Sequence, residues 1–360
     1  MSHRRRRDDP TVASRNPPPR RILVRRKVLF SAVTVFLCLA LLEGGARLFV
    51  HVAPNSRWQF HSQLVDTLGF PALNEVLVPD PDLFWTARPN LDHLRLEGHI
   101  IASAELRFSV STDANGCRQM PRPARVQRRI AFLGDSCTFG VGVDDEQTFA
   151  AVLQQRLPGV QCLNLGVPGY TAYQGRLRLE RFPFDAPPDA VVIAFGFNDG
   201  ASWDDRSDLE HAARLRAERS KLTRHSRLFT LLGQVLPRWA GAKSGGAADA
   251  RPRLRDDEFA AEVRAIAAWC RARRAEPILI VWPHRAQLER DDLTNKQHTL
   301  LELARTDNLR VVNLIPVFRS RGGPALFADV IHANRDGHAV VADALEPLLR
   351  EVLPAAKSAK

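Results

Sequence analysis

Residue types that together perform acyl transfer occur at two distant places in the sequence. Ser136 lies in IAFLGDSCTFGVG, where an apolar run leads into Gly-Asp-Ser and then into small residues. Near the other end of the chain, LFADVIHANRDGH places Asp329 three residues before His332. An aspartate next to a histidine fixes the imidazole tautomer and stabilises the charge that the ring gains from a serine proton. This set predicts Ser136 as nucleophile, His332 as its base and Asp329 as the residue that orients the base.

A serine nucleophile also needs donors for the oxyanion that forms during acyl transfer. If Ser136 begins a helix, its own backbone N–H has no partner within that helix. NLGVPGY then places Gly166, and FGFNDG places Asn198, at the ends of two further apolar runs. We expect the N–H groups of Ser136 and Gly166 and the side-chain amide of Asn198 to form an oxyanion hole, in which one donor contributes about 3 to 4 kcal/mol.

The elements that must position these residues begin after Ala124. Short apolar runs (RRIAFL, VQCLNL, DAVVIAFG, PILIVW and LRVVNL) alternate with helix-patterned segments such as DEFAAEVRAIAAWCRARRA and GHAVVADALEPLLREVL. This alternation predicts an α/β domain over residues 124–353, with a mostly parallel five-stranded sheet between two helical layers. Ligands bind at the carboxyl edge of such sheets, where Ser136, Gly166 and Asn198 are expected.

The alternation is interrupted between residues 200 and 256. This insertion holds a charged run, an amphipathic segment SRLFTLLGQVL and the Gly-rich GAKSGGAADARPR. Because it follows a strand end, it overhangs the ligand-binding edge. Three interpretations remain open: a lid over the site, a contact for the substrate, and a solvated surface insertion without a role.

The N-terminal part of the chain differs in character from this domain. The chain carries a net charge of +11, of which the first 27 residues contribute +8 through ten Lys or Arg and two Asp. The rest is only mildly basic, which disfavours a nucleic-acid partner. Residues 1–27 are expected to be a basic, disordered tail, and residues 51–123 a small extension with short strands, including HLRLEG and ELRFSVST. Residues 354–360 form a short C-terminal tail.

Residues 28–50 are apolar enough to predict a transmembrane helix. Only Glu43 and Arg47 interrupt them, and these two are one helical turn apart and can pair. The Arg-rich flank places the N-terminus in the cytoplasm, so the remaining chain is expected on the other side of a bacterial-type inner membrane, in the periplasm. A cleaved signal peptide is the alternative, although no convincing cleavage site follows the apolar run.

Other chemistries fit the sequence less well. A G-x-S-x-G nucleophile elbow is absent, because Thr138 stands two residues after Ser136. A metallophosphoesterase would use Asp135, Asp199 and the Asp329–His332 pair, but the clustered histidines of such sites are missing. We therefore expect no metal and no cofactor.

The other histidine near a strand end and the cysteines are expected to have structural roles. His284, in WPHR, follows another strand and is expected in a surface loop, although it could face the cleft. Five cysteines show no CxxC spacing, and a disulfide among Cys117, Cys137, Cys162 and Cys270 stays open. Cys137, next to the nucleophile, is expected to be buried packing.

Taken together, these motifs resemble those of the SGNH hydrolase superfamily, also called GDSL esterases or lipases. The signature Ser, Gly, Asn and His of that family fall in order on Ser136, Gly166, Asn198 and His332, with Asp329 in the Asp-x-x-His motif. The resemblance spans residues 125–353 and implies a flavodoxin-like fold. Ala333 departs from the proline or leucine that many members carry. PDPDLFWTARPN and TDANGCRQ are similar to an extension of membrane-anchored bacterial members.

The sequence thus predicts a membrane-anchored, extracytoplasmic serine esterase that forms an acyl-serine intermediate. Its expected substrate is an acyl ester of the cell envelope, a polysaccharide or a lipid. Two alternatives remain: an O-acyltransferase with the same residues, and a non-catalytic carbohydrate-binding or scaffold protein.

Overall fold

The computed structural model describes most of the 360-residue chain. The described residues are 20–52, 73–99, 105–202, 206–219, 226, 228, 251–290 and 292–353. The predicted segment SRLFTLLGQVL lies outside them except for Ser226 and Leu228, as do GAKSGGAADA and the C-terminal tail.

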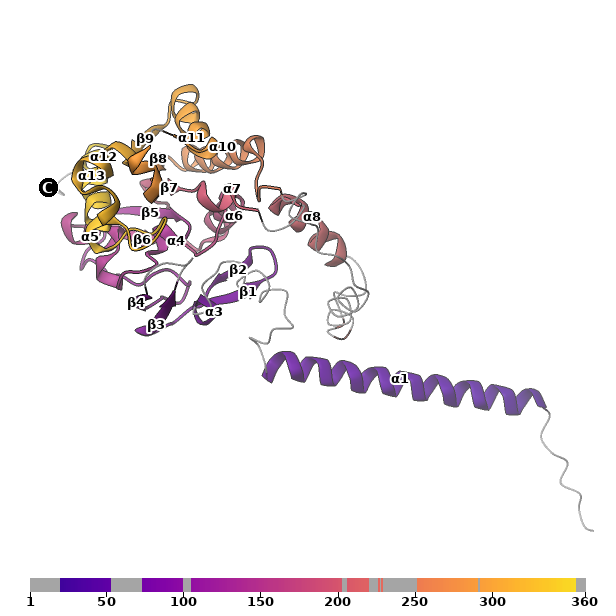
Figure 1. The fold of residues 1–360 in the computed structure, drawn as a ribbon. Helices are drawn as coiled ribbons and strands as arrows, with labels where there is room; N and C mark the ends of the chain where they lie inside the picture. The colour runs from indigo at the N-terminus through magenta and orange to yellow at the C-terminus, as the bar shows by residue number, and fades with distance from the viewer. Residues whose placement is uncertain are drawn as a thin grey trace, which may run out of the picture.

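A five-stranded parallel sheet forms the centre of the molecule (Figure 1). In spatial order its strands are β6 (Val160–Asn164), β5 (Arg128–Gly134), β7 (Ala190–Ala194), β8 (Glu276–Val281) and β9 (Arg310–Asn313). In sequence order this arrangement is 2-1-3-4-5, the order of flavodoxin-like folds. The three central strands β5, β7 and β8 are almost wholly buried, as expected for strands covered on both faces. The predicted fold class is confirmed.

Helices cover both faces of the sheet (Figure 1). On one face α6 (Ala172–Arg181) packs on α10 (Asp256–Ala272), which packs on α11 (Asn295–Thr306). On the other, α13 (Arg335–Val352) packs on both α5 (Phe149–Arg156) and α12 (Leu314–Arg321). The remaining elements of the domain are short or peripheral: α4 (Ser136–Phe139), η1 (Asp145–Gln147), α7 (Phe197–Gly200), α8 (Asp208–Arg219), η4 (Arg285–Glu289) and η5 (Gly323–Leu326).

The extension before the domain consists of two antiparallel strand pairs and one short helix, α3 (Leu73–Val76). Strand β1 (Leu77–Asp80) pairs with β2 (Phe84–Ala87), and β3 (Leu94–His99) pairs with β4 (Glu105–Val110). The apolar side chains of these strands join the core of the α/β domain. The extension is therefore packed onto the domain.

Helix α1 (Arg20–Val52) is long and apolar enough to span a membrane over Val24–Phe49, with a mean hydropathy of 2.1. It begins at Arg20, so the prediction of a disordered tail through residue 27 is wrong for residues 20–27. A run of three prolines, which disfavour a helix interior, ends at position 19 in the sequence. The Arg and Lys residues that follow are good helix formers, which is consistent with a helix that begins at Arg20. The predicted pair is present, because Arg47 donates to Glu43 at 2.7 Å. Glu43 also accepts from Ser226 Oγ at 2.6 Å.

Candidate active site

Ser136 is the first residue of α4, directly after strand β5. Asp135 caps this helix, because its Oδ1 accepts the Cys137 N–H at 2.9 Å. Gly134 permits the tight turn, since a Cβ there would lie 2.1 Å from Thr138 Oγ1 and 2.7 Å from Ala194 O. The strand end therefore delivers the Ser136 side chain, partly exposed, to the carboxyl edge of the sheet.

The loop before α13 brings His332 and Asp329 to this serine. His332 Nε2 lies 2.8 Å from Ser136 Oγ, and His332 Nδ1 lies 2.6 Å from Asp329 Oδ2. Asp329 Oδ1 accepts the backbone N–H groups of Ile331 and His332, at 2.8 and 2.7 Å. The residues predicted from two ends of the sequence thus form one continuous chain of hydrogen bonds.

The carboxylate of this chain is held in its charged form. Burial alone would raise the pKa of Asp329, but the hydrogen bond and the charge of His332, together with two backbone donors, lower it below its usual value. An ionised Asp329 accepts the Nδ1 proton, so in the neutral imidazole the lone pair lies on Nε2, the nitrogen that faces Ser136. This is the tautomer that a general base requires.

Further hydrogen bonds hold the loop that carries Asp329 and His332. Trp282 Nε1 donates to Ile331 O at 2.9 Å, and Asn334 caps α13 by accepting the Gly337 N–H at 3.0 Å. Cys137 also approaches Ile331 O, with its Sγ 3.7 Å away, and burial raises the pKa of its thiol well above the usual value. Cys137 is therefore a buried packing residue, as the sequence predicts. It and the other four cysteines are free thiols.

The prediction for Gly166 is wrong in this structure. Its N–H donates to the side-chain Oδ1 of Asn164 at 3.0 Å, and a Cβ at this position would lie 2.4 Å from Phe139 N. Gly166 is therefore a close-packing position whose donor is already used.

Gly169, three residues later in the same loop, offers a backbone donor that the sequence did not single out. It has a φ of +78°, and its N–H meets no acceptor among the described residues. The Ser136 N–H likewise has no acceptor in the part of the chain that the structure describes. The loop lies beside α4, because Val167 N donates to Gly134 O at 3.1 Å. The signal in the sequence was the Pro-Gly pair of NLGVPGY, a dipeptide typical of turns with a positive φ.

Asn198 lies at this edge as well, in α7, but its amide is already engaged. Its Nδ2 donates to Asp135 Oδ2 at 3.0 Å and to Tyr170 O at 3.2 Å. Asn198 therefore connects the nucleophile turn to the loop that contains Gly169. To bind an oxyanion, its amide would have to release one of these two acceptors.

Asp135 and Asp199, the aspartates considered for a metal site, have structural partners. Asp199 accepts the N–H groups of Ala172 and Gly196, both at 2.8 Å. Burial is the main cause that raises the pKa of Asp199 to about 7 and that of Asp135 to about 6. Among the described residues, no group of three or more His, Cys, Asp or Glu is arranged to hold a metal ion.

His284 is half-buried beside the site, and not in an exposed loop as expected. It lines a cavity of about 20 Å³ together with Asp135, Cys137, Phe197 and Trp282. Its ring lies edge-on to Phe197 at 5.2 Å, and burial lowers its pKa. A larger groove of about 710 Å³ lies elsewhere, between the extension and β6, and is not lined by Ser136 or His332.

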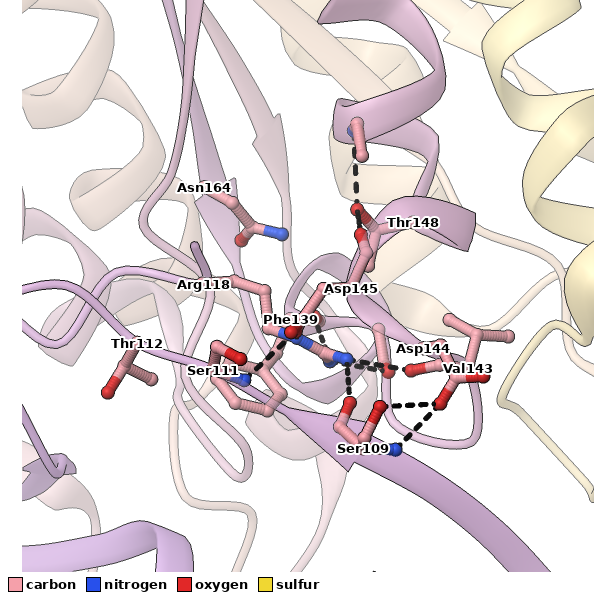
Figure 2. Close-up of polar contacts among 12 residues, drawn as sticks. Ser109, Ser111, Thr112, Arg118, Phe139, Val143, Asp144, Asp145, Thr148 and Asn164 are labelled. Atoms are coloured by element: carbon pink, nitrogen blue, oxygen red, sulfur yellow. Dashed lines mark hydrogen bonds and ion pairs between the residues drawn. The ribbon is translucent and has the colours of Figure 1, made fainter. Parts of the chain in front are cut away.

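The extension supports the nucleophile turn through the buried Arg118 (Figure 2). Its guanidinium donates to Phe139 O and Gly140 O at 3.1 and 3.0 Å, and to Val143 O at 2.7 Å. It also donates to Ser109 O in β4 and forms an ion pair with Asp145. All five N–H groups are thus used, and three of them bind carbonyls of the last residue of α4 and of the chain just after it.

This fold and this arrangement define a class of protein. A serine at the carboxyl edge of a parallel sheet, with an imidazole and a carboxylate behind it, is the geometry of an acyl-transfer enzyme. The chain belongs to the GDSL-like lipase/acylhydrolase family, whose pattern matches residues 132–340. It is an ester hydrolase of the SGNH/GDSL type.

Several solved structures are similar to the chain, all with low identity. A lipolytic G-D-S-L protein from Veillonella parvula is 14% identical, with a TM-score of 0.42, over 61% of this chain and 97% of its own. The acetylxylan esterase Axe2 from Geobacillus stearothermophilus is 19% identical, with a TM-score of 0.41, over 66% and 100%. The esterase EstA from Pseudoalteromonas is 14% identical, with a TM-score of 0.40, over 62% and 98%. No curated protein matches the chain significantly.

Proposed function

We propose that this protein is a membrane-anchored, extracytoplasmic serine esterase that removes short acyl groups, acetyl above all, from cell-envelope material. The observation that carries the proposal is the hydrogen-bonded chain from Ser136 Oγ through His332 to Asp329, with distances of 2.8 and 2.6 Å. Three groups with these roles at these distances are what nucleophilic catalysis by serine requires.

The proposed reaction has two halves. Ser136 Oγ attacks the ester carbonyl carbon while His332 Nε2 takes its proton, and Asp329 stabilises the resulting imidazolium. The N–H groups of Ser136 and Gly169 receive the oxyanion. When the tetrahedral intermediate collapses, His332 gives its proton to the leaving alkoxide, which departs as the alcohol. Water then attacks the acyl-serine while His332 takes its proton. When the second tetrahedral intermediate collapses, the bond between the acyl carbon and Ser136 Oγ breaks, His332 returns the proton to Oγ, and the carboxylic acid is released.

The size of the cavity next to the nucleophile supports a short acyl group. Asp135 and Cys137, which flank Ser136 in the sequence, line a cavity of about 20 Å³ together with Phe197 and Trp282; Ser136 and His332 do not line it themselves. A volume this small holds about one or two water molecules. It suits a methyl group far better than the chain of a lipid.

The exposed apolar surface of α1 supports the membrane anchor. Large apolar side chains from Val24 to Phe49 are exposed, and a helix surrounded by hydrocarbon requires such a surface. The Arg-rich flank supports a cytoplasmic N-terminus. We expect the protein to resist extraction from membranes by carbonate. We also expect protease added on the periplasmic side to digest its C-terminal domain. Release of a shortened, soluble chain would instead indicate a cleaved signal peptide.

Hydrolysis of p-nitrophenyl acetate, butyrate and octanoate by the full-length, detergent-solubilised protein tests the activity. We expect the acetate ester to be preferred and Ser136→Ala to abolish turnover. A Ser136→Ala protein as active as the wild type would overturn the serine mechanism. Preference for octanoate would overturn the short-chain assignment alone.

A further inference from the structure

The peptide bond between Pro168 and Gly169 is held from outside the α/β domain. Trp85, in strand β2 of the extension, donates its indole Nε1–H to Pro168 O at 2.8 Å. The carbonyl that it binds and the Gly169 N–H belong to the same planar peptide unit. In a trans peptide these two groups point in opposite directions. The indole therefore fixes where the Gly169 N–H points.

We propose that Trp85 is a positioning residue of the oxyanion hole, so that the N-terminal extension is part of the active site. The inference rests on the proposed function, in which the Gly169 N–H receives the oxyanion. A hydrogen bond to the carbonyl also polarises the peptide and strengthens its N–H as a donor. Trp85 thus acts on the reaction through Gly169, without touching the substrate.

The surroundings of Trp85 hold the indole in one place. Trp85 is fully buried, and its ring packs edge-on against Tyr170, with the centroids 6.1 Å apart. The Tyr170 hydroxyl donates back to the carbonyl of Trp85 at 2.8 Å. The loop and the strand are therefore joined by two reciprocal hydrogen bonds, one on each side of Gly169.

A third contact fixes the next peptide unit of the same loop. Arg253, near the end of the insertion, donates to Gly169 O at 2.6 Å, and its guanidinium lies 5.5 Å from the centre of the Trp85 ring. Arg253 is in turn paired with the buried Asp208 at 2.9 Å. Both carbonyls that flank the Gly169 N–H are thus held by residues outside the loop.

The backbone conformation of Phe84, the residue before Trp85, also indicates that Trp85 is held in a fixed position. Phe84 has a φ of +68°, in the left-handed region that a bulky side chain rarely adopts. Such a conformation is strained and persists only where the surrounding structure enforces it. Here it directly precedes the residue that binds Pro168.

Steady-state kinetics with p-nitrophenyl acetate test the proposal. Trp85→Phe keeps an aromatic ring but removes the donor, and we expect kcat to fall by about 10- to 100-fold, somewhat less than the loss of an oxyanion donor itself, with KM within about 2-fold. The matched control is Trp269→Phe in α10, the same replacement at a tryptophan whose indole N–H has no acceptor among the described residues. Because Trp269 does not contact the Pro168–Gly169 peptide, the kcat of this variant is expected within about 2-fold of wild type.

A second replacement separates positioning from folding. β-(3-Benzothienyl)alanine at position 85 has the shape of tryptophan without the N–H, so it should keep the packing and still lower kcat. Thermal unfolding shows whether the variant is folded. Labelling of Ser136 by a phosphonate, carried to completion, gives the concentration of enzyme with a reactive serine, to which kcat is referred. If this replacement keeps the wild-type kcat, or changes only KM, the proposal is overturned. If Ser136→Ala retains activity, the proposed function fails, and the role of Trp85 fails with it.

Discussion

Replacing Asp329 by asparagine is expected to reverse the direction of the hydrogen bond between His332 and Ser136. Oδ1 still accepts the N–H groups of Ile331 and His332, so the loop keeps its shape. The amide nitrogen then occupies the position of Oδ2, 2.6 Å from His332 Nδ1 in the wild type. Because an amide NH2 only donates, Nδ1 must become the acceptor, and the ring proton moves to Nε2.

The size of the effect follows from this change of tautomer. With a proton on Nε2, His332 donates to Ser136 Oγ and does not take its proton, so general-base catalysis is lost. The same change in serine proteases lowers kcat by about 10⁴-fold with the geometry intact. We expect a similar loss here, which corresponds to about 5.4 kcal/mol at about 1.36 kcal/mol for each factor of ten.

The assay is the hydrolysis of p-nitrophenyl acetate by wild type and Asp329→Asn, with circular dichroism and thermal unfolding as checks on the fold. Asp336→Asn is the matched control, since this carboxylate is exposed in the first turn of α13. Its kcat is expected within about 2-fold of wild type. A folded Asp329→Asn protein that keeps more than about a tenth of the wild-type kcat would refute the reasoning.

Three further predictions concern stability and specificity. Arg118→Met should lower the free energy of unfolding by about 3 to 5 kcal/mol in chemical denaturation, because buried carbonyls and Asp145 lose their donor. The pKa of Asp199 rises from 3.8 to about 7 on folding, chiefly through burial, so the folded state binds a proton that the unfolded state has released. Unfolding free energy should therefore fall, relative to Asp199→Asn, as pH rises from about 4 to 7. Phe197→Ala should raise kcat/KM for octanoate relative to acetate, since Phe197 lines the 20 Å³ cavity and a smaller side chain would enlarge it.

The sequence by itself determined the fold class and most of the candidate site. Apolar runs of strand length alternating with helix-patterned segments identified all five strands of the sheet, because this pattern depends only on neighbours a few residues away. The parallel order then placed Ser136 and Asn198 at one edge. The Asp-x-x-His spacing brought Asp329 next to His332 without further folding. Local chemistry was sufficient wherever the partners are close in sequence.

Only the tertiary structure decided which glycine has an N–H with no acceptor in the described part of the chain. NLGVPGY contains two candidates, and the choice depends on Asn164 accepting from Gly166 and on the positive φ of Gly169. Composition also gave no sign that Arg118, a charged residue, is buried with all of its donors used.

The role inferred for Trp85 could not be predicted from the sequence either, since Trp85 and Pro168 are 83 positions apart in the chain. Hydrogen bonds between distant segments exist only after the core has packed, because they depend on where the folded backbone places each carbonyl and donor. The sequence therefore determined the elements and the reacting groups, and the packing of the extension against the sheet decided how those groups are held.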